Sequence, residues 1–373
     1  MGAKDNLQRE LLLSGLGVKP FKERFPWIGP DLQTLRDTFI SENLPEETGY
    51  KIQIPIPKSI NGTYAAGNLL ALLDPPIGSL KTPIGLILML HGLGGSSKRQ
   101  GLRRMSIKLR KAGFSTLRLN LRGAEPGRHL AGGSYAAECN IDLFPVIRQA
   151  RELCKQIIQP THPNFYKIPL FGVGISLGGT ILLNACLKNK NAVNPNLPLL
   201  DGLVCTSSPL DLASCSSSIE RPRNIIYQRW LLKRLIKQII SDPFGISLKE
   251  KELLYKKSKS KPKINSIRDF DSIITAPRWG YRNVNHYYSE ASPLPLLIKD
   301  SSKIPPTLIL QSEDDPWVPA KGAKELAARI STLRDTALKV IITKTGGHNG
   351  FHGVTGCWGD YLVEQWLSKL VID

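Results

Sequence analysis

The sequence predicts an α/β protein in which helices flank a mostly parallel, doubly wound sheet, and three features of the chain support this prediction. Continuous apolar segments of strand length alternate with amphipathic segments of helix length, as in folds built from repeated βαβ units. A G-x-S-x-G pattern at 174–178 lies between such a strand and such a helix. About a hundred residues separate the apolar segments at 200–206 and 306–311, too many for a crossover, which predicts an insertion there.

The N-terminal part of the chain is expected to form an arm packed on this core. The segment 25–35 contains two prolines and a glycine, so it is poor helix material and is expected to be irregular. Further on, Ile52, Ile54 and Ile56 fall on one face of an alternating pattern, and an apolar stretch follows at 69–73. Two such half-buried segments predict an antiparallel pair of strands at the edge of the sheet.

From residue 84 onward, strands and helices alternate. The segment 84–90 is continuously apolar, as expected for a strand covered by helices on both faces. A helix should follow, because Leu102, Met105 and Leu109 form an apolar stripe opposite a basic face. The remaining strands are expected at 114–121, 166–173, 199–205, 306–311 and 338–343, and further core helices at 141–158 and 180–187.

The insertion at 213–300, which precedes the strand expected at 306–311, is predicted to be a helical lid. Its segment 225–240 has more apolar residues than one buried stripe needs, so part of it should line an acyl pocket; a helix simply packed on the core is the alternative. Between 221 and 263 there are thirteen lysines or arginines and three acids. The lysine-dense part, 249–263, is either a solvated loop or a contact for anionic membrane surfaces.

Composition and charge indicate a large globular protein with a basic surface. The 373 residues are 41% hydrophobic, and the formal net charge is +19, with a pI near 9.7. This charge favours anionic partners, although a general lysine excess would also explain it, and no nucleic-acid-binding motif accompanies it. The six cysteines form no C-x-x-C pair, which indicates buried thiols in a reducing, cytoplasmic setting. No signal peptide and no membrane-spanning apolar run is recognisable.

Ser176 is the candidate nucleophile, at the centre of the G-x-S-x-G pattern. A strand, a tight turn and a helix in succession would raise its hydroxyl at the tip of the turn, near a helix N-terminus that favours an anion. Gly174, Gly178 and Gly179 would remove the side-chain clashes of so sharp a turn. A glycine-rich turn that serves packing alone is the alternative.

A nucleophilic serine needs a base, and the base needs an acid to orient it. Asp314 and Asp315 follow the strand expected at 306–311, where catalytic groups gather in open α/β sheets. We expect Asp315 to be the acid, because it opens the phrase Asp-x-x-Val-Pro, the usual form after this strand in folds of this type. Glu313 and Asp314 are expected to hold the turn through their own hydrogen bonds.

The expected base is His348, which follows the last strand. Gly346 and Gly347 precede it and free the backbone to bring its ring back across the strand ends. The rival, His352, comes later and lacks these glycines.

An oxyanion formed by attack on a carbonyl needs two backbone N–H donors. One is expected from Leu177, directly after the nucleophile, and the other from Leu93 in the loop His91-Gly-Leu-Gly-Gly95, which follows an early buried strand. His91 should brace this loop. The histidine spacing predicts no metal site, and no G-x-G-x-x-G opens a helix after the first strand, so no cofactor is expected.

Short phrases along nearly the whole chain match the pattern of one protein family. They are Pro26-Trp27, Leu32-Gln33-Thr34, His91-Gly-Leu-Gly-Gly-Ser-Ser97, Leu119-Asn-Leu-Arg-Gly123, Gly174-Ile-Ser-Leu-Gly-Gly179, Ser208-Pro-Leu-Asp-Leu212, Tyr227-Gln-Arg229, Ala276-Pro277 with Gly280, Tyr287-Tyr288, Asp314-Asp-Pro316, and Gly346-Gly-His348 with Gly350-Phe351. Together they resemble the YheT/ABHD1–ABHD3-like family of α/β-hydrolases, the AB-hydrolase 4 family.

The resemblance implies the α/β-hydrolase fold and a triad of Ser176, Asp315 and His348. It also implies esterase or lipase action on short-chain esters or monoacylglycerols, and some relatives transfer acyl groups to alcohols. One departure bears on the substrate: the chain has Ala131-Gly-Gly-Ser-Tyr135 where such proteins commonly carry a His-Ser-Gly-type phrase. The resemblance to the family therefore says less about the substrate of this chain than about its catalytic chemistry.

The sequence as a whole predicts a serine carboxylic-ester hydrolase. Its expected parts are an N-terminal arm over 1–50, a core over 51–212 and 301–373, and the lid over 213–300. Its substrate should be a small-molecule or lipid ester, reached through transient peripheral contact with membranes. The alternatives are an acyltransferase that uses the same triad, and a non-catalytic binding module on a hydrolase fold.

Overall fold

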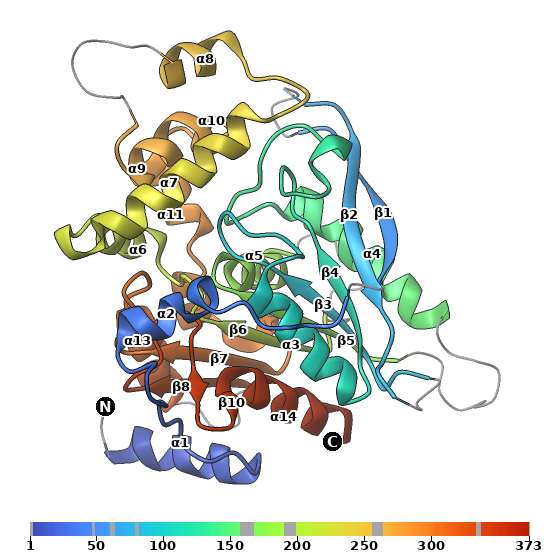
Figure 1. Cartoon of the computed structure of the whole chain (residues 1–373), viewed down its shortest axis with the longest axis vertical. Coiled ribbons are helices and arrows are strands. Elements are labelled where there is room, and N and C mark those ends of the chain that lie inside the picture. The colour runs from blue at the N-terminus through green and yellow to red at the C-terminus, as the bar shows by residue number, and fades with distance from the viewer. Residues whose placement is uncertain are drawn as a thin grey trace.

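An eight-stranded sheet forms the centre of the protein, in the order β1-β2-β4-β3-β5-β6-β7-β8 (Figure 1). The computed structural model describes residues 3–46, 49–59, 64–78, 82–156, 168–189, 199–255, 264–332 and 337–372. The strands are β1 (Tyr50–Ile56), β2 (Gly67–Asp74), β3 (Leu86–Leu90), β4 (Ser115–Leu119), β5 (Leu170–Ile175), β6 (Gly202–Thr206), β7 (Thr307–Ser312) and β8 (Leu338–Thr343). From β4 to β8 all neighbours are parallel, which confirms the predicted α/β class.

The first two strands form the expected antiparallel pair at one edge of the sheet. Ile52 pairs with Ala71 and Ile54 with Leu69, and β2 in turn pairs antiparallel with β4. Ile54 is buried, whereas Tyr50 at the start of the strand is exposed. The alternating pattern in the sequence therefore located this edge correctly.

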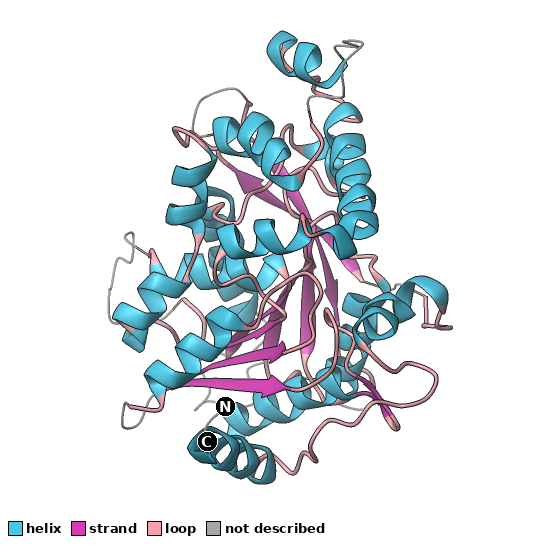
Figure 2. Ribbon diagram, turned by 90° about the vertical axis from the view of Figure 1, so that its left-hand side faces the viewer, coloured by secondary structure: helices cyan, strands magenta, loops and turns pink. Residues whose placement is uncertain are grey.

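Helices cover both faces of the sheet (Figure 2). In β3, Leu86, Leu88 and Leu90 join the apolar core under α4 (Asn140–Gln156) and α5 (Leu177–Leu187). The residues between them, Ile87 and Met89, join a second core with α1 (Ala3–Gly15), α3 (Gln100–Lys111) and α14 (Trp358–Ile372). Because side chains alternate along a strand, burial on both faces requires the continuous apolar run seen in the sequence.

The N-terminal part of the chain differs from the expectation. The segment predicted to be irregular contains α2 (Pro30–Phe39), so that prediction was wrong. Pro30 stands at the first helical position, where the missing N–H would have no helical partner, and Asp31 favours the positive end of the helix dipole. Pro30 therefore marks the start of a helix and does not prevent one.

The insertion between β6 and β7 is helical and lies over one end of the sheet, at the top of Figure 1. It contains α6 (Leu212–Ile219), α7 (Ile225–Ile240), α8 (Leu248–Tyr255), α9 (Ile267–Phe270), a π-helical turn (Asp271–Thr275), α10 (Ala276–Arg278), α11 (Val284–Ala291) and α12 (Leu294–Lys299). We call this insertion the lid. The lysines of 256–263 lie outside the described residues.

Buried polar contacts, one of them an ion pair, connect the lid to the loop after β4. Arg128 lies 3.1 Å from Asp242, and Asp242 also accepts a hydrogen bond from the N–H of Gly133. Within the lid, Arg278 pairs with Glu250 at 2.6 Å and donates to Ser134 of the same loop. Removing one partner of such a pair leaves an uncompensated buried charge, so these contacts fix the position of the lid.

The six cysteines are all free thiols, and four of them are buried.

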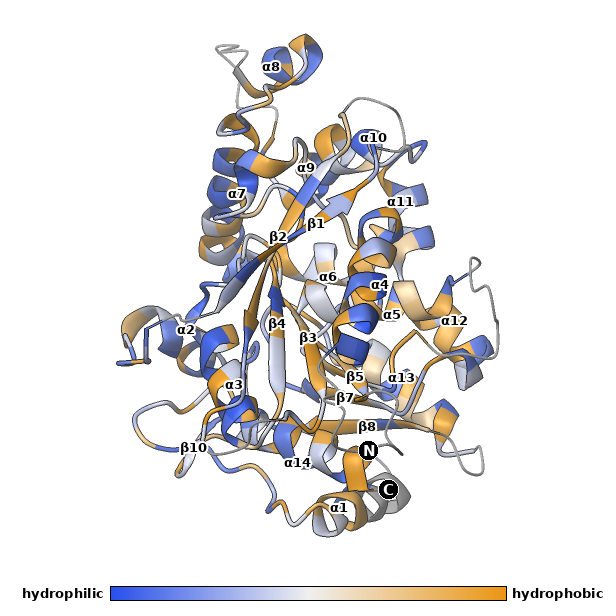
Figure 3. Cartoon of the chain, turned by 90° about the vertical axis from the view of Figure 1, so that its right-hand side faces the viewer, coloured by the Kyte–Doolittle hydropathy of each residue, from blue (hydrophilic) through white to orange (hydrophobic). Residues whose placement is uncertain are grey.

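Hydrophobic residues, orange in Figure 3, make up much of the central strands, in keeping with the complete burial of β3. In the part of the chain that the structure describes, no helix has the length and hydrophobicity needed to cross a membrane.

Candidate active site

Ser176 lies in the sharp turn between β5 and α5. Its backbone has φ 55° and ψ −126°, a conformation that costs on the order of 1–3 kcal/mol for a residue with a side chain. A Cβ at Gly174 would lie 2.3 Å from the Cα of Gly179, and one at Gly178 would lie 2.5 Å from the carbonyl oxygen of Leu90. Only glycine fits at both positions, so the pattern around Ser176 meets the packing requirement of this turn.

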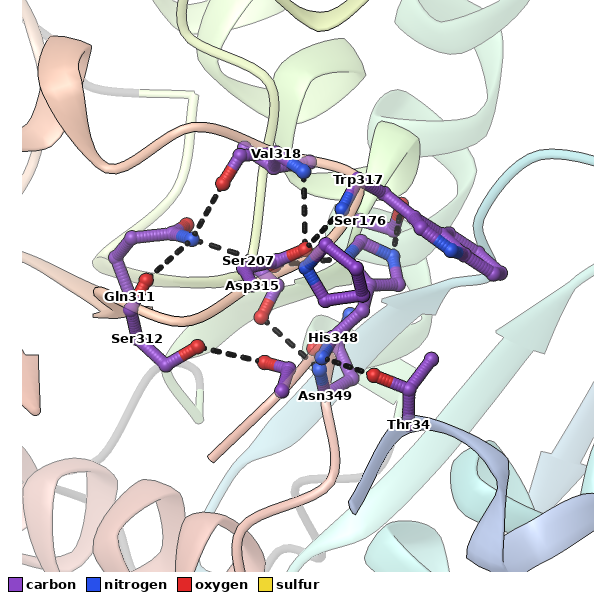
Figure 4. A network of polar contacts seen from close by, with 12 residues as sticks. Thr34, Ser176, Ser207, Gln311, Ser312, Asp315, Trp317, Val318, His348 and Asn349 are labelled. Atoms are coloured by element: carbon purple, nitrogen blue, oxygen red, sulfur yellow. Dashed lines mark hydrogen bonds and ion pairs between the residues drawn. The ribbon is translucent and has the colours of Figure 1, made fainter. Parts of the chain in front are cut away.

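The side chains of Ser176, His348 and Asp315 form a hydrogen-bonded chain (Figure 4). The Nε2 atom of His348 lies 3.0 Å from Oγ of Ser176, and its Nδ1 atom lies 2.9 Å from Oδ2 of Asp315. Because the ionised carboxylate can only accept, Nδ1 must carry the proton and Nε2 is left to accept from the serine hydroxyl. This is the arrangement that a serine nucleophile and its base require.

The turn after β7 holds the carboxylate of Asp315 in place. Its Oδ1 atom accepts hydrogen bonds from the N–H groups of Trp317 and Val318, at 2.8 and 2.9 Å, and Oδ2 accepts from Nε2 of Gln311 at 3.2 Å. The Asp315 side chain is fully buried. Its two oxygens therefore have fixed and different partners, and only Oδ2 faces His348.

The neighbouring acid, Asp314, has a different contact. Its Oδ1 atom accepts from the N–H of Gly347 at 2.9 Å, so it holds the loop that carries His348 and does not meet the ring. Burial raises the pKa of Asp314. The structure thus brings Asp315, and not Asp314, to the imidazole.

The loop carrying His348 also packs against α2. The N–H of His348 donates to Oγ1 of Thr34 at 2.8 Å, and Thr34 donates to the carbonyl oxygen of Pro30 at 2.6 Å. A Cβ at Gly347 would lie 2.4 Å from that same carbonyl oxygen. The ring of Trp317 lies against the imidazole, with 4.4 Å between ring centres. The histidine is therefore held by its backbone and by its ring.

The rival histidine, His352, belongs to a separate buried cluster. Its backbone N–H and carbonyl oxygen bond to the side chain of Gln33, and its Nε2 atom lies 3.5 Å from Asp37. Burial lowers the pKa of His352 to about 3, so the ring is neutral at physiological pH. The structure places it beside α2 and not in the hydrogen-bonded chain of Ser176.

The loop after β3 passes directly over Ser176. A Cβ at Gly92 would lie 2.8 Å from Cβ of Ser176, so only glycine allows this approach. The N–H groups of Leu93 and Leu177 have no hydrogen-bond acceptor among the described residues. Free N–H groups beside a nucleophile are what an oxyanion site needs, and these two belong to the residues that the sequence predicts.

Two aromatic residues brace this loop. Nδ1 of His91 lies 2.8 Å from the carbonyl oxygen of Gly92, and Nε2 accepts from the N–H of Leu121 at 3.3 Å. Burial lowers the pKa of His91 to about 4, so it stays neutral and serves as the expected brace. The hydroxyl of Tyr135 accepts from the N–H of Gly94 at 2.7 Å and donates to the carbonyl oxygen of Gly92 at 3.2 Å.

A cavity of about 320 Å³ opens beside Ser176 and extends under the lid. Its lid side is largely apolar and includes Leu231, Leu235 and Ile239 from α7 and Phe270 from α9. The expectation that part of α7 lines a pocket is therefore correct for its inner face. The described residues contain no group of three His, Cys, Asp or Glu side chains that could hold a metal ion.

The sequence analysis did not assign a role to three residues of this site: Thr34, Tyr135 and Trp317. The helix that carries Thr34 could have been predicted, because Pro30 and Asp31 are typical of a helix start. No sequence signal, however, places Thr34 at the backbone of His348. Tyr135 lies in the segment where the chain departs from the family pattern, yet its contact with Gly94 depends on how that loop folds. Trp317 follows the acid directly, and only the turn geometry places it against the imidazole.

Comparison with known proteins identifies what this chain is similar to. A family model described as "Serine aminopeptidase, S33" matches residues 81–351. The human protein named "Phospholipase ABHD3" is 27% identical over 292 residues, which cover 76% of this chain and 64% of that protein. The "Putative esterase YheT" of Escherichia coli is 30% identical over 212 residues, which cover 55% of this chain and 56% of the relative. The chain thus matches less than two thirds of the length of either relative.

Solved structures show the same fold. The esterase Pf2001 of Pyrococcus furiosus aligns with a TM-score of 0.53 and 12% identity, covering 89% of this chain and 96% of that structure. At this identity the likeness concerns the α/β-hydrolase fold alone. Together with the sequence relatives, it confirms the resemblance that the short phrases indicated.

Proposed function

Because the chain belongs to the α/β-hydrolase family described as serine aminopeptidase, S33, we propose that it is a serine hydrolase that cleaves carboxylic esters. The observation that carries this proposal is the 3.0 Å contact between Nε2 of His348 and Oγ of Ser176, with Asp315 behind the ring. The names of the relatives, an esterase and a phospholipase, favour ester over peptide substrates. We propose an activity of the short-chain carboxylesterase or monoacylglycerol-lipase kind.

In the proposed reaction, His348 takes the hydroxyl proton of Ser176 as Oγ attacks the ester carbonyl carbon. The carbonyl oxygen becomes an oxyanion that accepts hydrogen bonds from the N–H groups of Leu93 and Leu177. Asp315 holds the imidazolium through Nδ1. His348 then protonates the departing alcohol, and a water molecule, deprotonated in turn by His348, releases the acid from the acyl-enzyme.

The apolar cavity under the lid is the proposed acyl site. Burying each CH₂ group of an acyl chain against such a wall contributes about 0.8 kcal/mol, so chain length should affect binding. An alcohol that reached the acyl-enzyme in place of water would complete an acyl transfer on the same residues, which is the alternative activity. A non-catalytic binding module would not need the fixed orientation of His348 between two partners.

We expect the wild-type protein to hydrolyse p-nitrophenyl esters, with a preference that changes along a series of acyl chains from acetate to dodecanoate. Leucine p-nitroanilide, an aminopeptidase substrate, should be cleaved far more slowly, because its charged α-ammonium group would have to enter a largely apolar cavity. If the enzyme also transfers acyl groups to alcohols, ethyl esters should form when ethanol is added to the assay. Cleavage of the anilide without cleavage of any ester would contradict the proposed substrate class.

We also propose that the lid contacts anionic membranes and that the protein is cytoplasmic, in keeping with its free thiols. Helix α7 contains four cations and no acid. Among its apolar residues Ile226 is 78% exposed and Ile240 is 43% exposed, which gives the mixture of exposed apolar and basic residues typical of interfacial helices. Figure 3 shows this alternation along α7.

Lys233→Gln with Lys237→Gln should weaken binding to vesicles containing phosphatidylserine by about tenfold or more, at about 1 kcal/mol for each cation near the surface. Co-sedimentation at low salt would measure this. A double variant with the same charge change at Lys303 and Lys369, outside the lid, is the control. Equal binding to neutral and anionic vesicles would refute the membrane proposal.

A further inference from the structure

Two arginines without acidic partners lie beside the loop over Ser176. Arg99 directly precedes α3, and Arg234 lies on α7 of the lid. Both are half-buried and flank the ring of Trp230, with guanidinium carbons 5.8 and 4.8 Å from its centre. Neither forms an ion pair with a carboxylate in the described part of the chain. There, Arg99 donates only to the carbonyl oxygen of Gly94, at 3.3 Å, and Arg234 makes no hydrogen bond.

This lack of carboxylate partners distinguishes Arg99 and Arg234 from the buried arginines of the molecule. The buried arginines of the core and lid have carboxylates close by: Arg104 with Asp360 at 2.7 Å, Arg118 with Asp74 at 2.9 Å, Arg122 with Asp142 at 2.8 Å, and Arg278 with Glu250 at 2.6 Å. By contrast, burial and the nearby charge of Arg234 lower the pKa of Arg99 to about 10. Burial also lowers the pKa of Arg234. Two partly desolvated cations that repel each other would be stabilised by an anion.

The position of the pair relates it to the chemistry. Arg99 and Trp230 line the same cavity as Ser176. A Cβ at Gly94 would lie 3.7 Å from Nε of Arg234, and Gly94 directly follows Leu93, the expected oxyanion donor. An anionic group held here would therefore lie beside the loop that supplies the expected oxyanion donor and at the cavity that contains Ser176.

We propose that Arg99 and Arg234 bind a phosphate monoester group carried by the ester substrate, next to the scissile bond. Two guanidinium groups match a phosphate monoester, which carries about −1.5 to −2 charges at pH 7, and each can donate two parallel hydrogen bonds to its oxygens. A carboxylate would neutralise only one of the two cations. This inference rests on the proposed ester hydrolysis, because the phosphate is assigned to the substrate whose acyl chain fills the cavity under the lid.

Binding without turnover tests this inference separately from hydrolysis. Decyl phosphate and the neutral ester 1-decanoylglycerol are titrated calorimetrically into the Ser176→Ala protein. Decyl phosphate should bind at least about tenfold more tightly, as expected for charge-assisted hydrogen bonds from two cations. Arg99→Gln and Arg234→Gln, each made in the same background, should each weaken its binding about tenfold. Lys98→Gln, the same charge change at an exposed neighbour, should leave it unchanged.

The remaining outcomes would overturn the assignment. Equal affinity for the two ligands would show that no anion is recognised. An equal loss for both ligands in the arginine variants would show that the substitutions disturb the whole pocket. Inorganic phosphate bound as tightly as decyl phosphate would identify a site for free anion that is independent of the acyl cavity. In each case hydrolysis of neutral esters by the wild type would still be measured on its own, so failure of the inference and failure of the proposed function remain distinct.

Discussion

Ser176→Ala should reduce ester hydrolysis by on the order of a million-fold in kcat, the size of effect found when a triad serine is removed. The substitution deletes the only atom that can form the acyl-enzyme and leaves His348 with no hydroxyl to deprotonate. Hydrolysis of a p-nitrophenyl ester, followed to long times against an enzyme-free blank, measures the loss. Turnover above about a thousandth of the wild-type rate would show that another residue is the nucleophile.

The folded structure should survive this change. Alanine adopts the same strained backbone as serine, and the hydroxyl makes its hydrogen bond to His348 and to no other described residue. The thermal midpoint should therefore stay close to the wild-type value, which separates a loss of chemistry from a loss of fold. Ser96→Ala, a serine just beyond the loop over the active site, is a matched control that should keep its activity.

Much of the core could be predicted from the sequence because its signals are local. A strand buried on both faces must be continuously apolar, and a nucleophile in a tight turn must have glycines around it; both constraints act within about ten residues. The same reasoning located β3, β5 and the Ser176 turn. It failed at 25–35, where two prolines and a glycine predict an irregular segment although Pro30 occupies the first helical position, which favours proline.

The parts of the site that could not be predicted depend on contacts between distant segments. Thr34 meets His348 across 314 residues of chain, and Tyr135 meets Gly94 across 41. Their own residue types are compatible with many roles, so only the fold assigns one. The unpaired arginines are the clearest case, because a lysine- and arginine-rich sequence gives no indication of which cations lack a carboxylate in the folded protein.

Asp315→Asn should lower kcat by roughly four orders of magnitude, whereas Asp314→Asn should lower it by less than about tenfold. The two substitutions remove the same charge from adjacent residues, so each is the control for the other. The difference arises because Asp315 bonds to the imidazole and Asp314 bonds to the N–H of Gly347, which an amide oxygen can still accept.

The contacts of Asp315 explain why the asparagine should be so damaging. Its Oδ1 atom accepts from the N–H groups of Trp317 and Val318, so the amide oxygen of an asparagine must take that position. The amide NH₂ group then faces His348, where it can only donate. Nδ1 would have to accept, the proton would move to Nε2, and the ring could no longer take the proton of Ser176.

The same geometry adds a cost to stability. Nε2 of Gln311 donates to Oδ2 of Asp315, and in the variant it would face another donor in a fully buried position. An unsatisfied buried contact of this kind costs about 1–3 kcal/mol, so a lower thermal midpoint should accompany the lost activity of Asp315→Asn. Asp314→Asn should show at most the small loss of kcat given above and a smaller change in thermal midpoint than Asp315→Asn. If Asp314→Asn proved the more damaging of the two, Asp314 would be the acid that orients His348, and the turn after β7 would have to rearrange when substrate binds.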